Sequence, residues 1–83
     1  MFYVYVLSSE KDGKYYIGQT NDLDDRVQRH HAGYVKSTRN RLPLKLLYFE
    51  EFVTRKQAMH FEKYLKSGAG HKFVEQKIGR RGP

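Results

Sequence analysis

The chain has 83 residues and no cysteine, which excludes disulfide bonds and thiolate zinc sites. Hydrophobic residues make up 39% of it and aromatic residues 14%, which predicts one small folded domain and argues against disorder. The net charge of +7 is uneven, because residues 54–83 hold eight basic and two acidic side chains against eight and seven in residues 1–53.

Charge and hydropathy narrow the class of partner. A basic half on a small domain indicates a polyanion such as a nucleic acid, although a solvated basic surface has the same composition. No apolar run approaches the roughly 20 residues that cross a bilayer, and the N-terminus lacks the pattern of a signal peptide. We therefore expect a cytoplasmic protein with no membrane partner.

The first predicted element is a strand over residues 2–7. Side chains alternate there, so Val4 and Val6 share one face and Tyr5 lies on the other. A polar segment ending in Asp12-Gly13 follows, which is typical of a hairpin turn.

A second strand is predicted over residues 14–19, with Tyr16 and Gly18 on one face and Ile17 on the other. Gly18 removes a side chain next to Tyr16, and a glycine inside a strand often marks the close approach of a backbone or a ligand. We expect one face of this hairpin to pack on the core and the other to stay accessible.

A helix is predicted from about Asp22 to His31. Thr20 or Asn21 can cap it, and the aspartates of its first turn suit the positive end of the helix dipole. Arg26 and His30 are four residues apart, so they project from adjacent turns on one side.

Residues 34–43 form a predicted basic loop that holds Lys36, Arg39 and Arg41 and no acidic residue. Such a loop beside an active site is placed to grip a phosphate backbone, and a solvated connector is the alternative. A third strand, rich in Leu, Tyr and Phe, is predicted over residues 44–52.

A second helix is predicted to begin at Thr54, which fits a capping box with Gln57. Glu62 lies at the margin of the apolar stripe of this helix. A half-buried carboxylate needs a cation, a metal or a donor, and Lys66 offers a routine ion pair four residues on.

The remaining residues predict a helix end, a further helix and a tail. Ser67–Gly70 is predicted to end the second helix, and a short third helix is expected over about residues 71–78. Residues 79–83 are expected to form a loose basic tail.

Several side chains on these elements suit phosphodiester hydrolysis, which needs a nucleophilic water, charge stabilisation at the phosphate and help for the leaving oxygen. Arg26 offers a fixed positive fork for phosphate oxygens, and Glu62 offers a hard oxygen ligand for Mg²⁺. Tyr16 or His30 could take the proton from water, and Tyr5 could orient that water or hold the tyrosine pair. Each residue alone also has an ordinary structural explanation, so the inference depends on the set.

Two short motifs carry a resemblance to the GIY-YIG nuclease superfamily. Tyr3-Val4-Tyr5 is a loose form of the first family motif, and Tyr16-Ile17-Gly18 is an intact form of the second. The two motif tyrosines are eleven residues apart, as the family pattern expects.

Three further residues extend the resemblance. Arg26 follows the second motif tyrosine by ten residues, where the family places its essential arginine. His30 follows one turn later, where several members carry a histidine. Glu62 resembles the metal-binding glutamate of the family.

The resemblance covers about residues 2–78 and is to the small stand-alone bacterial members. It implies the GIY-YIG endonuclease fold, of the α/β (α+β) class, with a three-stranded, mainly antiparallel sheet flanked by helices. The expected organisation is a single GIY-YIG domain over residues 1–83.

The resemblance also implies cleavage of DNA with one divalent metal ion, Mg²⁺ or Mn²⁺. By this likeness Tyr16 is the candidate general base and Tyr5 its companion, in a catalytic set that includes His30. Arg26 would steady the phosphate, and Glu62 would hold the metal.

This chain departs from the family pattern at three places. Tyr3 replaces the leading glycine of the first motif, and Gln19 stands where the excision-repair members have a lysine. Many members carry a late asparagine, and none follows Asn40 here.

The sequence thus predicts a divalent-metal-dependent DNA endonuclease, with repair or recombination as its setting. Characterised members gain specificity from additional domains, so target choice is expected to come from DNA structure or from a protein partner. The alternative is a non-catalytic nucleic-acid-binding module that keeps the fold. An adaptor protein without a nucleic-acid partner is a third hypothesis.

Overall fold

The computed structural model of the chain describes residues 1–78, and the predicted tail over 79–83 lies outside them. Along the described part, no helix is long and apolar enough to span a membrane. The predicted α+β class with a three-stranded antiparallel sheet is confirmed. The elements are β1 (Phe2–Ser9), β2 (Tyr15–Thr20), α1 (Leu23–His31), a 3₁₀ turn (Arg39–Arg41), β3 (Leu44–Phe52), α2 (Arg55–Leu65) and α3 (Gly68–Ile78).

β1 is the central strand, in the order β2-β1-β3, and it pairs antiparallel with both neighbours. Tyr5 lies opposite Gly18 of β2 and Phe49 of β3. A register shift between Val6 and Leu7 marks a bulge in the pairing with β3. Because β2 is an edge strand, its outer side is available to line a site.

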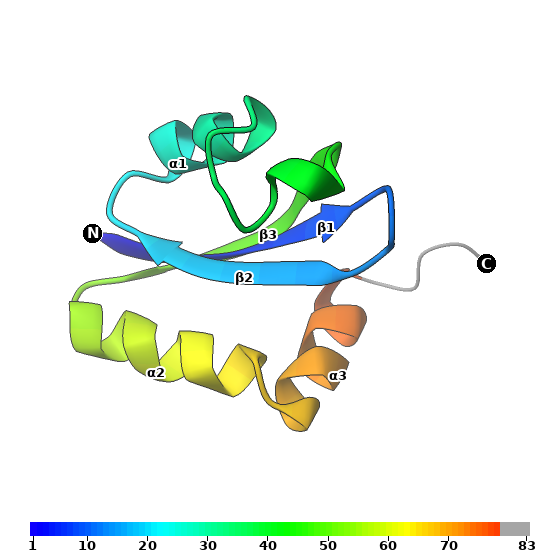
Figure 1. Cartoon of the computed structure of the whole chain (residues 1–83). Coiled ribbons are helices and arrows are strands. Elements are labelled where there is room, and N and C mark those ends of the chain that lie inside the picture. Colours follow the sequence, from blue (N-terminus) through cyan, green and yellow to red (C-terminus); the bar gives the residue numbers. More distant parts are fainter. Residues whose placement is uncertain (79–83) are drawn as a thin grey trace.

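Helices cover both faces of the sheet (Figure 1), with α2 and α3 on one face and α1 on the other. Val4 and Val6 are fully buried against α2 and α3, whereas Tyr5 and Leu7 pack on the opposite face. The predicted alternation along the first strand is therefore confirmed. On the other face Tyr5 and Leu7 are buried, whereas Tyr16 and Gly18 of β2 stay partly exposed and line a cleft.

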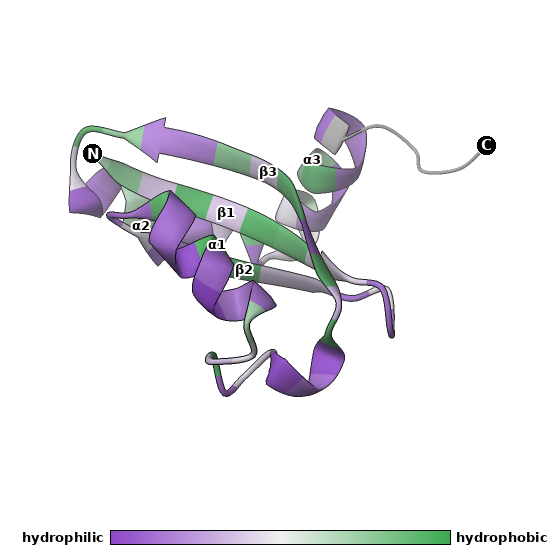
Figure 2. Ribbon diagram, turned by 90° about the horizontal axis from the view of Figure 1, so that it is seen from above, coloured by the Kyte–Doolittle hydropathy of each residue, from purple (hydrophilic) through white to green (hydrophobic). Residues whose placement is uncertain are grey.

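Hydropathy follows this layering. Figure 2 shows hydrophobic residues along the central strand β1, while α1 is hydrophilic along most of its length. The helix buries His30, and Leu23 packs beside Tyr5 and Leu7. α1 thus lies on the sheet by a narrow contact, which leaves its other side chains available for polar roles.

The helices α1 and α2 both begin with side-chain caps. α2 begins with the predicted capping box, in which Thr54 and Gln57 each bond the other's backbone. α1 is capped by Asp22, whose carboxylate accepts a hydrogen bond from the Asp25 amide over 3.2 Å. The prediction that Thr20 or Asn21 caps this helix is wrong, since the helix begins one residue later than expected.

The segment predicted to end the second helix also starts the third. The Ser67 hydroxyl accepts a hydrogen bond from the Gly70 amide over 3.2 Å, so α3 begins at Gly68 and not near residue 71. A Cβ atom on Gly70 would overlap the Tyr64 carbonyl and the Leu65 backbone. Glycine is needed there because α3 packs tightly against the end of α2.

Two substitutions in α3 test this close packing. Gly70→Ala should lower the free energy of unfolding by about 1–3 kcal/mol, because the added methyl group forces α3 away from α2. Gly68→Ala is the matched control. Its Cβ meets nothing within 4 Å, so it should raise stability by about 0.5 kcal/mol. Urea unfolding followed by circular dichroism measures both, and equal midpoints for the two variants would contradict the packing argument.

Candidate active site

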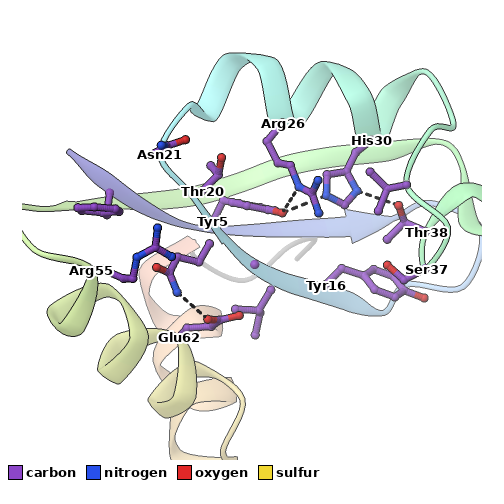
Figure 3. Close-up of a pocket in the computed structure, with 15 residues that line it drawn as sticks. Tyr5, Tyr16, Thr20, Asn21, Arg26, His30, Ser37, Thr38, Arg55 and Glu62 are labelled. Carbon is purple, nitrogen blue, oxygen red and sulfur yellow. Dashed lines mark hydrogen bonds between the residues drawn. The ribbon is translucent and has the colours of Figure 1, made fainter.

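A cleft of about 570 Å³ runs along the outer side of β2 (Figure 3). α1 and the loop after it form one wall, and α2 forms the other. Side chains from opposite faces of the sheet meet here because they reach around an edge strand. Five residues that the sequence predicts to be functional line this cleft: Tyr5, Tyr16, Arg26, His30 and Glu62.

Tyr5 reaches the cleft by lying across a glycine. Tyr5 is only 3% exposed and lies opposite Gly18 in the neighbouring strand. A Cβ atom on Gly18 would overlap the phenol ring and its hydroxyl. The sequence indicates a close approach at this glycine, and the group that approaches is a side chain of the same sheet.

The Tyr5 hydroxyl is the centre of a hydrogen-bond chain. Nε of Arg26 donates to it over 3.4 Å, and Nε2 of His30 lies 3.1 Å from it. Nδ1 of His30 lies 2.8 Å from Oγ1 of Thr38, which is 1% exposed. Both ring nitrogens of this buried histidine are therefore satisfied.

The protonation of His30 follows from its surroundings. Its pKa is lowered from the ordinary 6.5, first because burial disfavours the charged ring and then because Arg26 and His31 add positive charge. The imidazole is therefore neutral at pH 7, with one nitrogen that donates and one that accepts.

The hydroxyl of Tyr16 has different partners. Nε of Arg41 donates to it over 3.1 Å, and the same guanidinium pairs with Asp12 at 3.0 Å. The two phenols that the sequence suggests as a pair are thus held by separate groups. Of the three cations predicted to grip nucleic acid, Arg41 borders the cleft through Tyr16, while Lys36 and Arg39 are exposed on the loop outside its lining.

Glu62 enters the cleft from α2 with both carboxylate oxygens engaged. Nε2 of Gln19 donates to Oε1 over 3.1 Å, and Nζ of Lys66 lies 3.2 Å from Oε2. The routine helix pair with Lys66 is therefore present, and the carboxylate also faces the cleft. Its side chain is 22% exposed, which agrees with the expectation of a half-buried acid.

Sequence reasoning gave no role in the cleft to several residues that line it, among them Arg55, Gln19 and Thr38. Arg55 lies two helical turns before Glu62, a spacing that places both on one side of α2 and that could have indicated it. Gln19 was noticed only as a departure from a family lysine. Thr38 gives no local signal, because its contact with His30 depends on how the loop folds back.

Metal-binding capacity at this site is limited to oxygen donors. Within residues 1–78, no group of three or more His, Cys, Asp or Glu side chains could enclose an ion. Oε1 of Gln19 is buried without a hydrogen-bond partner in the described residues, and its amide contacts Glu62. The carboxylate of Glu62 is the acidic oxygen donor of the cleft lining, and it suits a hard ion such as Mg²⁺, which keeps most of its waters.

Comparison with protein families matches residues 1–73 to the GIY-YIG catalytic domain. The chain belongs to the GIY-YIG family. That family generally consists of endonucleases, which suggests nuclease activity for this domain.

Relatives of this GIY-YIG domain include small bacterial proteins named UPF0213. One from Streptococcus pneumoniae is 46% identical over 65 residues, which cover 77% of this chain and 65% of the relative. YazA of Bacillus subtilis is 39% identical over 71 residues, covering 81% of this chain and 72% of that protein. This chain thus spans just under two thirds of the first relative's length.

A solved structure has the same fold. The solution structure of the UPF0213 protein BH0048 from Bacillus halodurans aligns with a TM-score of 0.61 and 35% identity. The alignment covers 96% of this chain and 89% of that one. The GIY-YIG fold predicted from the sequence is therefore confirmed.

The lowered pKa of His30 predicts a pH-dependent stability. Between the folded pKa and about 6.5 the unfolded chain binds a proton that the folded chain resists, so stability should fall as pH drops below about 6.5. His30→Gln should remove this component, and His60→Gln, an exposed position on α2, should retain it. Melting temperatures at several pH values between about 5 and 8 measure the difference. Parallel curves for the unsubstituted protein and His30→Gln would rule out a buried neutral imidazole.

Proposed function

We propose that this protein is a divalent-metal-dependent endonuclease that hydrolyses DNA phosphodiester bonds in one cleft. The observation that carries the proposal is that Arg26, the phenols of Tyr5 and Tyr16, His30 and Glu62 come from four separate elements and line the same cleft. A positive fork, proton carriers and a hard oxygen ligand are what phosphodiester hydrolysis requires.

Arg26 is the residue that we propose binds the scissile phosphate. Its Nε is used on the Tyr5 hydroxyl, which leaves the terminal nitrogens of the guanidinium for phosphate oxygens. No carboxylate in the described residues lies within ion-pair distance of Arg26, so its charge is available to an anionic substrate.

Tyr5 and His30 form a relay for the proton of the attacking water. When Nδ1 of His30 carries its proton and donates it in a hydrogen bond to Thr38, Nε2 is free to accept the proton of the Tyr5 phenol. The phenol oxygen in turn accepts a proton from the attacking water. A bound phosphate offsets the charge of Arg26, and so relieves one cause of the lowered His30 pKa. The family likeness assigns the base to Tyr16, which has the cation Arg41 beside its hydroxyl.

Glu62, which is hydrogen-bonded to Gln19, is the residue that we propose binds the divalent metal ion. A divalent ion held there would supply Lewis-acid stabilisation of charge on the phosphate. Gln19 fixes the carboxylate orientation, and the surface pair with Lys66 is weak enough for a cation to replace.

A second candidate is a nucleic-acid-binding module without catalysis. The observation that favours it is the engagement of both Glu62 oxygens by protein groups. This candidate predicts salt-sensitive binding of DNA and no metal-dependent cleavage.

Cleavage with matched variants tests the function. Linear, nicked, flapped and four-way DNA are incubated with and without Mn²⁺ or Mg²⁺. Arg26→Ala and Glu62→Gln should each lower the cleavage rate by about 10²–10³-fold, because each removes charge stabilisation at the phosphate. Arg29→Ala, one turn along α1, and Glu75→Gln, on α3 outside the cleft, should stay within about twofold.

Circular dichroism of each variant checks that the fold survives. Cleavage that persists in both cleft variants would point to a contaminating nuclease. Binding without cleavage of any substrate would favour the non-catalytic module.

The two tyrosines are separated by a further pair of variants. Tyr5→Phe should lower the cleavage rate by about 10²-fold or more, because the relay to His30 loses its first member. Tyr16→Phe should cost less than about tenfold, since it removes one contact with Arg41 at the rim. The rates are measured under single-turnover conditions. A larger loss in Tyr16→Phe would assign proton removal to Tyr16.

A further inference from the structure

We propose that Arg55 and Asn21 form a second phosphate subsite, at the end of the cleft away from Tyr16. Figure 3 shows Arg55 and Asn21 at one end of β2 and Tyr16 at the other, with Arg26 between them. This subsite rests on the proposed function, because its ligand is a backbone phosphate adjoining the one at Arg26. Two anchored phosphates would fix the direction of the DNA strand along β2.

Arg55 is held in place by an aromatic ring. Its guanidinium carbon lies 5.2 Å from the centre of the Phe2 ring, and both residues line the cleft. Stacking on a ring face restrains the planar guanidinium and leaves the N–H groups on its rim free to donate. Such a restrained fork suits the bidentate recognition of a phosphate.

The charge of Arg55 is uncompensated. Arg29 and Arg41 pair with Asp25 and Asp12, whereas no carboxylate among residues 1–78 lies within ion-pair distance of Arg55. Glu62 is the one acidic residue in the cleft lining, and its oxygens are taken by Gln19 and Lys66. An anion from outside the chain is the partner that this end of the cleft lacks.

Asn21 supplies a neutral donor at the same end of the cleft as Arg55. It lies in the turn between β2 and α1, is exposed, and lines the cleft. The hydroxyl of neighbouring Thr20 bonds the backbone of Asp22, so Thr20 stabilises the turn. The amide of Asn21 is exposed and can donate a hydrogen bond to a phosphate oxygen.

Binding in the absence of metal tests the subsite without relying on cleavage. The probe is a fluorescein-labelled flapped DNA in EDTA, followed by fluorescence anisotropy across a salt series. Arg55→Ala should weaken binding about tenfold and reduce the slope of log K against log salt by about 0.9. Lys56→Ala removes the same charge one residue on, outside the cleft lining, and should change affinity less than about twofold.

A phosphate scan locates the contact. Methylphosphonates replace one backbone phosphate at a time, and one position should weaken the unsubstituted protein while having no effect on Arg55→Ala. Arg55→Lys should keep the salt slope and lose part of the affinity, because lysine retains the charge without the fork. Equal melting temperatures exclude misfolding as the cause.

The outcomes separate this subsite from the hydrolase. A scan position that weakens binding of the unsubstituted protein and not of Arg55→Ala supports the subsite. If no DNA is cleaved in that case, only the hydrolase is overturned. The subsite is overturned, even where cleavage occurs, if Arg55→Ala and Lys56→Ala lower the affinity for DNA equally. It is also overturned if Arg55→Ala shows the same methylphosphonate scan as the unsubstituted protein. No retention of the flapped DNA by the unsubstituted protein at low salt in EDTA overturns the subsite, and the cleavage panel with metal decides the hydrolase separately.

Discussion

The packing of the Tyr5 phenol across Gly18 is the constraint on which the site depends. Tyr5 belongs to the central strand, so its hydroxyl can reach the cleft only where the edge strand has no side chain. At that point the hydroxyl meets Arg26 and His30, which α1 presents from adjacent turns. A side chain at position 18 would separate a buried strand from the helix above it, and the hydrogen-bond chain to Thr38 would lose its origin.

The strand order converts this local contact into a cleft. Because β2 lies at the edge of the order β2-β1-β3, groups above and below the sheet can approach the same strand from both faces. Arg26 comes from one layer, and Arg55 and Glu62 come from the other. Two arginines face one carboxylate in this lining, so the cleft itself is positive, as a polyanionic substrate requires.

Local patterns in the sequence predicted the strands and helices better than the connections and contacts between them. The two-residue period of β1 and the capping box of Thr54 depend on neighbours along the chain, and both are confirmed. The glycine at position 70 is predicted as part of a helix end, but it lies inside α3. A residue without a side chain is needed there for the contact between α2 and α3, which the sequence alone does not reveal. The same limit applies to Thr38 and Arg55. Their places in the cleft arise from loop folding and strand order, whereas the spacing within the family motifs marks Tyr5 and Arg26 directly.

Gln19 shows how a departure from a family pattern can be read physically. A lysine at this place would put a positive charge beside Glu62 and compete with a divalent ion for the carboxylate. The neutral amide fixes the same carboxylate by a hydrogen bond and leaves its charge intact. The remaining competitor is Lys66, whose side chain is 56% exposed, so solvent screens its charge and weakens its hold on the carboxylate. The carboxylate is therefore oriented firmly and neutralised weakly, which is the condition under which a single acidic side chain can attract a hard cation.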